Sequence, residues 1–302
     1  MLIVHTLKLT YYGLVKKKLK HRLAFVAIVL GAIVAGCFLV LKLPYEMTAL
    51  PAAAIVPQQE VASTTGQAPI IVQSPLFNYI EIIGGCDWSY TGTCVNMRSG
   101  PGTQFPIVTR LRTGIVLKVE ASTTAADGHN WYKVIFDGEI RYPERVKGDW
   151  YVADDAEDVR PFTDNGDSQS KPGVVASTTK RIVVNLSHEM LYAYDGDTLF
   201  MEEPISTGLE MTPTLPGHFT VYKKTPSRYM QGPIPGVSDQ DYDLPGVPWN
   251  LYFTVDGAVI HGAYWHNHFG EPWSHGCVNL PPDQAQKLYQ WTVLGTPVTV
   301  ER

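Results

Sequence analysis

The pattern of apolar and polar positions separates one long apolar run from many short ones. From Leu23 to Leu41, 19 residues carry no charge. At about 1.5 Å per residue, this run spans about 28 Å as a helix, enough for the hydrocarbon core of a bilayer. Five basic residues lie between positions 16 and 22, and only Lys42 follows closely. Since basic flanks stay in the cytoplasm, the pattern predicts a cytoplasmic segment over 1–22, a single transmembrane signal-anchor helix over 23–43 and an extracytoplasmic remainder.

The same run also admits a lipoprotein interpretation. Val34-Ala35-Gly36-Cys37 resembles a lipobox, which implies cleavage before Cys37 and lipidation of its thiol. The apolar run continues to Leu41, whereas a cleaved signal core is about 7 to 15 residues long and gives way to polar sequence. The length favours the uncleaved anchor, and both interpretations attach the protein to the cell membrane with its larger part outside.

Beyond the apolar run, short strand-like segments alternate with polar stretches. Residues 44–75 lack a hydrophobic period and are rich in Ala, Pro, Gln, Ser and Thr, which predicts a flexible linker. Over 76–156, short apolar runs are separated by turn signals such as Ser99-Gly100-Pro101-Gly102 and Asp127-Gly128, which predicts a small all-β barrel. Residues 157–179 are polar again and predict a second linker.

The last segment, 180–302, is predicted to be mostly β-sheet. Arg181–Leu186 and Leu191–Tyr194 have the composition of strands. Pro281-Pro282-Asp283 starts a short helix, since proline is favoured at the first helical position, and Ala285, Leu288 and Trp291 then lie on one side. The predicted fold class is therefore mainly β, with one membrane helix and one short helix.

Composition and charge narrow the class of protein. With 45% hydrophobic and 18% charged residues over 302 positions, the chain has the composition of folded domains. Seven of its 24 basic residues lie in 1–43, where there is no acidic residue, so 17 basic residues face 29 acidic ones in the remainder. An acidic ectodomain with net charge −12 and no Lys/Arg cluster argues against nucleic acid as a partner.

Candidate chemistry is concentrated around one cysteine. Cys277 directly follows Gly276, His275 lies two positions before it, and His261 lies 16 positions before it. A free thiol has a pKa of about 8.5, so an attacking cysteine needs an imidazole to take its proton. Gly276 permits a tight turn that aims backbone N–H groups at a developing oxyanion. The cluster is that of a thiol nucleophile with bases nearby.

A metal site is the main chemical alternative for the same residues. The ligand types present are His261, His266, His268, His275 and Cys277. Structural zinc sites bring paired ligands at short spacing together with a second pair some distance away, and no second pair of cysteines is present. The sequence therefore predicts neither a metal nor another cofactor.

The residues around Cys277 resemble the signature of the YkuD-type L,D-transpeptidases, a His-Gly followed by [Ser/Thr]-His-Gly-Cys-x-Asn. It occurs here as His261-Gly262 and Ser274-His275-Gly276-Cys277-Val278-Asn279. The resemblance covers roughly 180–302 and includes Ser206-Thr207-Gly208, Thr212–Gly217 and Trp265–Gly270. It implies that a cysteine thioester forms on peptidoglycan stem tetrapeptides and is resolved by an amine of another stem, giving 3→3 cross-links. It also implies inhibition by β-lactams of the carbapenem type.

The resemblance assigns roles residue by residue. The catalytic set comprises Cys277 as nucleophile, His261 as general base, Gly262 orienting His261 through its carbonyl, His275 in support and Gly276 as an oxyanion N–H donor together with Cys277. The substrate-binding set comprises Ser274, Asn279, Trp265 and Trp273. The two tryptophans are candidates to wall the cleft against water. Ser274 and Asn279 are equally compatible with satisfied turn residues.

The small domain resembles the bacterial Src-homology-3-like modules of cell-wall enzymes. The matching segments are Val95–Gly102, Trp131–Val134 and Gly148–Val152, and an insertion over 141–147 departs from the usual compact ending. Such modules are thought to bind wall peptides. Cys86 and Cys94 flank one short loop here, and outside the cytoplasm thiols oxidise, which predicts a disulfide between them and leaves Cys277 unpaired.

Three rival functions remain to be separated from transpeptidation. Water in place of the amine would give an L,D-carboxypeptidase. A cysteine-histidine endopeptidase has its nucleophile before its histidine, whereas His261 and His275 both precede Cys277. A non-catalytic wall-binding protein would not need an intact His-Gly and Ser-His-Gly-Cys.

Overall fold

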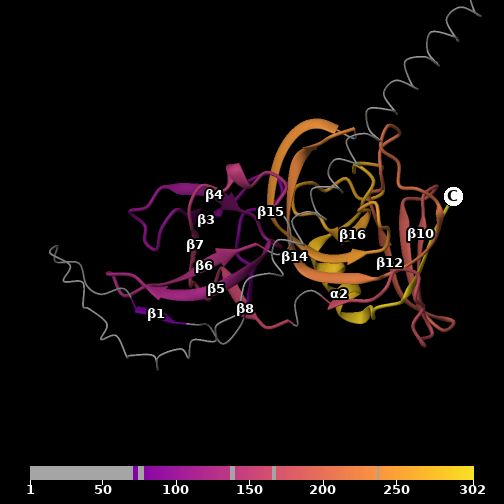
Figure 1. The fold of residues 1–302 in the computed structure, drawn as a ribbon, viewed down its shortest axis with the longest axis horizontal. Helices are drawn as coiled ribbons and strands as arrows, with labels where there is room; N and C mark the ends of the chain where they lie inside the picture. The colour runs from indigo at the N-terminus through magenta and orange to yellow at the C-terminus, as the bar shows by residue number, and fades with distance from the viewer. Residues whose placement is uncertain (1–70, 74–77, 137–139, 165–167, 237) are drawn as a thin grey trace, which may run out of the picture. The chain divides into compact units, whose positions relative to one another are not determined.

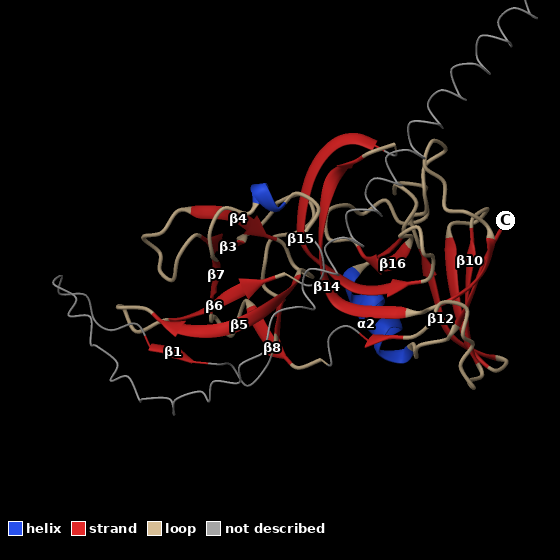
Figure 2. Ribbon diagram, in the orientation of Figure 1, coloured by secondary structure: helices blue, strands red, loops and turns tan. Residues whose placement is uncertain are grey.

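The computed structural model describes most of the chain after residue 70. The described ranges are 71–73, 78–136, 140–164, 168–236 and 238–302, and they belong to one compact unit over 63–302. Strands dominate these ranges (Figure 2). The predicted segment 1–22, the anchor over 23–43 and the lipobox at Cys37 lie outside the described residues. Within the described ranges, no helix has the length and apolar character needed to cross a membrane.

The small domain is an antiparallel sheet of eight described strands in the order β4-β3-β7-β6-β5-β2-β8, with β1 paired to β5. The strands are β1 (Ile71–Gln73), β2 (Tyr79–Ile82), β3 (Val95–Arg98), β4 (Ile107–Leu111), β5 (Val116–Thr124), β6 (Asn130–Ile135), β7 (Trp150–Ala153) and β8 (Val159–Phe162). The alternation expected of half-buried strands is plain in β3, where Val95 and Met97 are buried and Asn96 and Arg98 are less so. The prediction of a small β domain is confirmed for this part of the chain.

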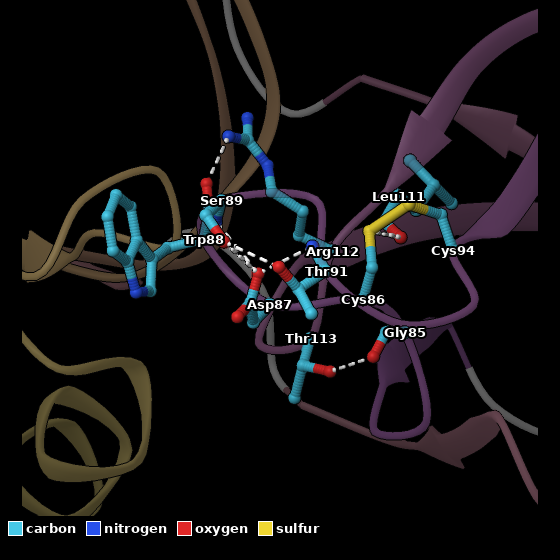
Figure 3. Close-up of a disulfide and its surroundings, with 10 residues drawn as sticks. All are labelled: Gly85, Cys86, Asp87, Trp88, Ser89, Thr91, Cys94, Leu111, Arg112 and Thr113. Carbon is cyan, nitrogen blue, oxygen red and sulfur yellow. Dashed lines mark hydrogen bonds between the residues drawn. A yellow bond between two sulfur atoms is a disulfide. The ribbon is translucent and has the colours of Figure 1, made fainter.

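A short loop after β2 is closed by a disulfide between Cys86 and Cys94 (Figure 3). Inside this loop the carboxylate of Asp87 accepts the backbone N–H groups of Ser89 and Thr91 at 2.9 and 2.8 Å. The Ser89 hydroxyl also donates to this carboxylate at 2.8 Å, and of these hydrogen bonds it lowers the pKa of Asp87 most. The covalent bond and the carboxylate together order a loop that has few apolar residues to bury.

The C-terminal domain contains two five-stranded sheets among the described residues. One has the order β12-β11-β10-β18-β13 and the other β17-β16-β15-β14-β9. The first sheet comprises β10 (Lys180–Asn185), β11 (Met190–Asp195), β12 (Thr198–Pro204), β13 (Gly217–Thr220) and β18 (Pro297–Glu301). The second comprises β9 (Ser168–Gln169), β14 (Lys223–Ile234), β15 (Ser238–Tyr252), β16 (Val259–Gly262) and β17 (Val278–Leu280). Most pairs are antiparallel, but β10 with β18 and β16 with β17 are parallel.

The predicted short helix is α2 (Pro282–Trp291). Its buried residues are Ala285, Leu288 and Tyr289, and Trp291 stacks on Phe200 with ring centroids 4.8 Å apart. The Lys224 ammonium donates to the carbonyl oxygens of Tyr289 and Thr292 at 2.7 and 2.6 Å, where a cation complements the helix C-terminus. A 3₁₀ turn, η1 (Pro143–Arg145), lies in the small-domain insertion.

Residues 157–179, predicted as a linker, contain two strands in the structure. β8 pairs with β2 in the small domain, and β9 pairs with β14 in the C-terminal domain. Val159 is almost fully buried, but the remaining residues of β8 and β9 are polar or partly exposed. Pairing at a sheet edge depends on main-chain hydrogen bonds, so it leaves little trace in the side-chain pattern.

The two domains share a packed interface within the compact unit. Tyr229, Val247 and Tyr264 of the C-terminal domain belong to the core cluster of the small domain. The Ser227 hydroxyl donates to the Val116 carbonyl at 2.6 Å across this interface. Both Ser227 and Val247 belong to the long curved hairpin formed by β14 and β15 (Figure 1). The small domain therefore supports the hairpin directly.

Candidate functional site

The imidazole of His261 lies on β16, and the thiol of Cys277 lies directly before β17, the parallel neighbour of β16. In the ladder between β16 and β17, Ile260 pairs with Val278 and His261 pairs with Asn279. Ile260 and Val278 are buried in the core of the domain. Because side chains alternate along a strand, His261, next to Ile260 in β16, faces away from that core, and Cys277 lies in the turn that leads into Val278. Both line a cleft of about 1850 Å³.

The ring of His261 has a defined tautomer. Its Nδ1 lies 3.0 Å from the carbonyl oxygen of Gly262. A carbonyl oxygen only accepts, so Nδ1 carries the proton and Nε2 keeps a free lone pair. Burial lowers the pKa of His261 to about 4, the hydrogen bond to Gly262 acts in the opposite direction, and the charge of Arg228 lowers it further. The imidazole is therefore neutral at about pH 7, with the basic nitrogen available. The carbonyl of Gly262 therefore contacts the ring that the sequence predicts it to orient.

The Cys277 thiol is neutral at rest for a similar reason. Burial raises the pKa of Cys277, while the charge of Arg228 and a backbone hydrogen bond with Val259 act in the opposite direction. Among the described residues no hydrogen bond joins the thiol to His261. The structure thus holds a neutral thiol and a neutral imidazole in one cleft, and Cys277 is a free cysteine.

A tight turn closed by Ser274 precedes β17. The Ser274 hydroxyl donates to the Cys277 carbonyl at 2.6 Å and accepts the N–H of Gly276 at 3.1 Å. Gly276 has φ +109°, a conformation that a residue with a side chain rarely adopts. The N–H of Gly276, predicted as an oxyanion donor, is thus already engaged, whereas that of Cys277 has no partner in the described chain. The hydroxyl of Ser274, predicted to bind substrate, is used within the turn.

Thr214 supports this turn from the neighbouring segment. Its hydroxyl donates toward the carbonyl oxygens of Gly276 and Cys277 at 3.1 and 3.4 Å, and it accepts the N–H of Gly208 at 2.9 Å. The side chain is nearly fully buried. The sequence offered a signal for this residue, because Thr214 lies in the Thr212–Gly217 segment that resembles the family, but it predicted no role.

A buried carboxylate supports the same turn from farther away. Glu189 accepts the N–H and the hydroxyl of Thr207 at 2.7 and 2.5 Å. The Thr207 carbonyl in turn accepts the N–H groups of Trp273 and Ser274, each at 2.9 Å. Glu189 has φ +49°, and burial raises its pKa. Nothing in the sequence distinguishes Glu189 from an exposed turn residue, so the sequence analysis missed it.

Asn279, predicted to bind substrate, is buried at the wall of the cleft. Its amide lies 2.9 Å from Nε2 of His266, and its backbone forms a bridge with Ser206. Burial lowers the pKa of His266 to about 4, and its Nδ1 accepts the N–H of His268 at 3.1 Å. The side-chain amide of Asn279 is thus engaged by the protein itself.

The two predicted tryptophans lie at the cleft in different ways. Trp265 is partly buried, with its ring centroid 5.7 Å from that of His261. Trp273 is 45% exposed and stacks on His268 at 3.8 Å. His275 also lines the cleft and is half-buried. In the ranges that the structure describes, no three His, Cys, Asp or Glu side chains are grouped to hold a metal ion.

Two family models match the chain, one in each domain. Residues 179–300 match the model of the YkuD family, the L,D-transpeptidase catalytic domain. This part of the chain is similar to the L,D-transpeptidase catalytic domain. Residues 93–142 match the model of the bacterial SH3 domain. Both resemblances predicted from the sequence are confirmed, and the L,D-transpeptidase domain contains the cleft residues described above.

Individual relatives of the L,D-transpeptidase domain share limited identity with the chain. The probable L,D-transpeptidase 3 of Mycobacterium tuberculosis is 33% identical over 102 residues, which are 32% of this chain and 38% of that protein. The Enterococcus faecium L,D-transpeptidase C442S mutant is 27% identical, with TM-score 0.37, over 42% of this chain and 50% of that one. Mycobacterium tuberculosis L,D-transpeptidase 3 in complex with a faropenem-derived adduct is 19% identical, with TM-score 0.39, over 58% and 91% of the two chains. The chain thus spans 38% of the length of the curated relative that it matches.

Proposed function

We propose that this protein is a peptidoglycan L,D-transpeptidase that forms 3→3 cross-links through a thioester on Cys277. One observation carries the proposal: the free Cys277, directly before β17, and His261 on the adjacent parallel strand β16, whose Nδ1 is held by the Gly262 carbonyl, line one cleft. Similarity to the L,D-transpeptidase catalytic domain supports the substrate class, the stem peptides of peptidoglycan.

Acylation starts from the neutral pair. Nε2 of His261 takes the thiol proton as Sγ of Cys277 attacks the carbonyl carbon of the third stem residue. The backbone N–H of Cys277 is the donor best placed to receive the developing oxyanion, because the N–H of Gly276 is held by Ser274. The C–N bond then breaks, the imidazolium returns its proton to the leaving amine, and a terminal D-Ala departs. A thioester remains on Cys277.

Transfer reverses these steps with a different amine. The side-chain amine of an acceptor stem attacks the thioester carbonyl and gives its proton to Nε2 of His261. The C–S bond breaks, Sγ takes the proton back, and the new amide is the 3→3 cross-link. Because the base lies on a buried ring oriented by Gly262, it is positioned for both half-reactions.

The deciding experiment is product analysis with purified ectodomain and disaccharide tetrapeptides. We expect cross-linked dimers and released D-Ala from the wild type, and neither product from Cys277→Ala or His261→Ala. Intact dimers from Cys277→Ala, or unchanged substrate with the wild type, would refute the proposal. Circular dichroism of each variant controls for folding.

L,D-carboxypeptidase activity is the second candidate, since water can resolve the same thioester. The exposed Trp273 ring at the cleft favours transfer if it keeps water from the acyl carbon. We expect dimers as the main wild-type product and a shift toward free tripeptide in Trp273→Ala. Tripeptide as the sole wild-type product, at every acceptor concentration, would assign the protein to the carboxypeptidases.

β-Lactam inhibition follows from the same nucleophile. The Mycobacterium tuberculosis relative, L,D-transpeptidase 3, has a structure in complex with a faropenem-derived adduct. For this chain we expect a carbapenem to acylate Cys277, because ring opening supplies an acyl donor to a thiolate that His261 generates. Intact mass spectrometry would detect one adduct on the wild type and none on Cys277→Ala.

We also propose an extracytoplasmic site of action, with the protein held by its N-terminal segment. The uncharged run from Leu23 to Leu41 and its basic flank support this placement. Protease added to spheroplasts should digest residues after 43 and leave the N-terminus protected. Mass spectrometry of the membrane form separates an uncleaved Met1 from a lipidated Cys37.

A further inference from the structure

The cleft around Cys277 is cationic although the chain is acidic. Its charged lining residues, histidines aside, are Arg112, Arg141, Lys223, Arg228 and Asp256. Four cations thus face one carboxylate, in a chain with a formal net charge of −5. A concave site with this balance concentrates anionic ligands.

Two of the four cations are engaged by the protein itself. The Arg112 guanidinium lies 4.5 Å from the centroid of Tyr90 and 4.8 Å from that of Tyr264, and it is 9% exposed. The Lys223 ammonium lies 5.1 Å from the Tyr252 ring and also has a polar or electrostatic partner. These contacts give both residues a structural role, so neither is the best candidate to bind a ligand in the cleft.

Arg228 is held in place but has no anionic partner. Its guanidinium lies 5.5 Å from the centroid of Tyr252, and the residue is half-buried on β14. Among the described residues it forms no ion pair, and its guanidinium donates no hydrogen bond. A guanidinium has five N–H donors in a rigid fork that fits a carboxylate. Because the side chain lines the cleft and is only half-buried, these donors are accessible to a ligand that enters the cleft.

The charge of Arg228 acts on the groups that carry out the chemistry. It lowers the pKa of both Cys277 and His261 and acts in the same direction on Tyr242. All three side chains line the same cleft as Arg228. The guanidinium therefore lies near the point where an acyl donor must be placed.

We propose that Arg228 binds the free α-carboxylate of the peptide residue that is expelled when Cys277 attacks. This inference rests on the proposed function. In a peptide cut one residue from its end, that carboxylate is attached to the same Cα as the leaving nitrogen, so it lies next to the reacting bond. A side-chain carboxylate of the third residue is separated from the bond by a longer chain. Recognition of the terminal carboxylate restricts cleavage to the last peptide bond, and a bidentate guanidinium contact supplies both energy and orientation.

The anion site can be tested without any peptide by alkylating Cys277. The rate of reaction with iodoacetamide, a neutral reagent, depends on the ionisation and accessibility of the thiol. The rate with iodoacetate depends on the same two properties and also on any cation near the thiol that attracts its carboxylate. We expect Arg228→Gln to lower the iodoacetate-to-iodoacetamide rate ratio about tenfold, as the loss of a charged hydrogen bond implies. Arg228→Lys should retain part of the ratio. Arg141→Gln, which removes an exposed cation from the same cleft, should change it less than about twofold.

Equal slowing of both reagents in Arg228→Gln would overturn the inference, because Arg228 would then act only on the ionisation of the thiol. An unchanged ratio would overturn it as well. Thermal unfolding of each variant separates these outcomes from misfolding.

Paired peptide substrates test which carboxylate is bound. The wild type should prefer a tetrapeptide with a free terminal carboxylate over its C-terminal amide by about tenfold or more in kcat/KM, and Arg228→Gln should remove this preference. A second pair of peptides differs only in whether the side-chain carboxylate of the third residue is free or amidated. If Arg228→Gln removes a preference within this pair instead, Arg228 binds the side-chain carboxylate, and its assignment to the terminal carboxylate is overturned. If the wild type turns over neither peptide, the proposed function fails while the alkylation ratio still tests the anion site. If turnover is normal and Arg228→Gln discriminates like the wild type, the function stands and the inference fails.

Discussion

Arg145 of the small domain donates a hydrogen bond to the carbonyl oxygen of Gly232 at 2.6 Å, although 87 positions separate them in sequence. Gly232 lies near the far end of β14, and the ring of Tyr242 packs where a side chain of Gly232 would be. Tyr142 adds a bond from its hydroxyl to the Pro233 carbonyl at 2.6 Å. The insertion over 141–147, unexpected in a compact module, therefore contacts the hairpin whose Tyr242 lines the cleft.

Removing this contact should loosen the hairpin without affecting the thiol. Arg145→Gln deletes the bond to Gly232 and the ion pair with Asp241 at 3.0 Å. We expect hydrogen exchange of β14 and β15 near their turn to accelerate about tenfold, with a higher KM and an unchanged alkylation rate of Cys277 by iodoacetamide. Lys147→Gln, an exposed change in the same insertion, serves as control. Identical exchange in the two variants would mean that the insertion does not hold the hairpin.

The Thr214 hydroxyl should be needed to hold the turn that precedes β17 and contains Cys277. Thr214→Val keeps the shape of the side chain but leaves the N–H of Gly208 and the carbonyl of Gly276 without this partner. An unsatisfied buried polar group costs about 1–3 kcal/mol, so we expect a lower midpoint of urea unfolding. A displaced nucleophile should also lower kcat about tenfold or more. Thr214→Ser restores the hydroxyl and should recover both quantities; failure of this rescue would assign the effect to packing.

The reactivity of Cys277 should rise with pH beyond the range of an ordinary thiol. Burial raises the pKa of Cys277, so at about pH 7 the thiolate fraction is smaller than that of a free cysteine. We expect the rate of alkylation by iodoacetamide to continue rising above about pH 8.5, the usual thiol value. A plateau below that pH would show that the free protein already stabilises the thiolate.

Stability should fall as the pH falls from about 6.5 toward 4. Burial lowers the pKa of both His261 and His266 to about 4 from 6.5. Between these values the unfolded chain binds more protons than the folded one, so acid favours unfolding. Each histidine contributes on the order of 3 kcal/mol across the window. His266→Gln should reduce the pH dependence of the free energy of urea unfolding, whereas His188→Gln, at an exposed turn, should not. Equal pH dependence in the two variants would contradict this account.

The residues that carry the proposed chemistry could be predicted from the sequence because their relations are local. Gly276 precedes Cys277 directly, and Gly262 follows His261, so covalent geometry alone brings a flexible turn to the thiol and a carbonyl to the base. The helix after Pro281 was predictable for the same reason, since its apolar spacing and its prolines lie within ten residues. The proximity of Cys86 and Cys94 follows from the short loop between them.

Only the tertiary structure decided which distant groups surround that chemistry. Glu189 supports the turn around Cys277 through Thr207, and Ser274 occupies the N–H of Gly276. Arg228 faces the cleft, and Arg145 reaches Gly232 from another domain. None of these contacts leaves a periodic pattern or a characteristic residue spacing in the sequence, because each depends on how strands far apart in the sequence pair and pack. A polar side chain in a turn or on a strand looks the same in sequence whether water or a buried partner meets it, and only the fold determines which.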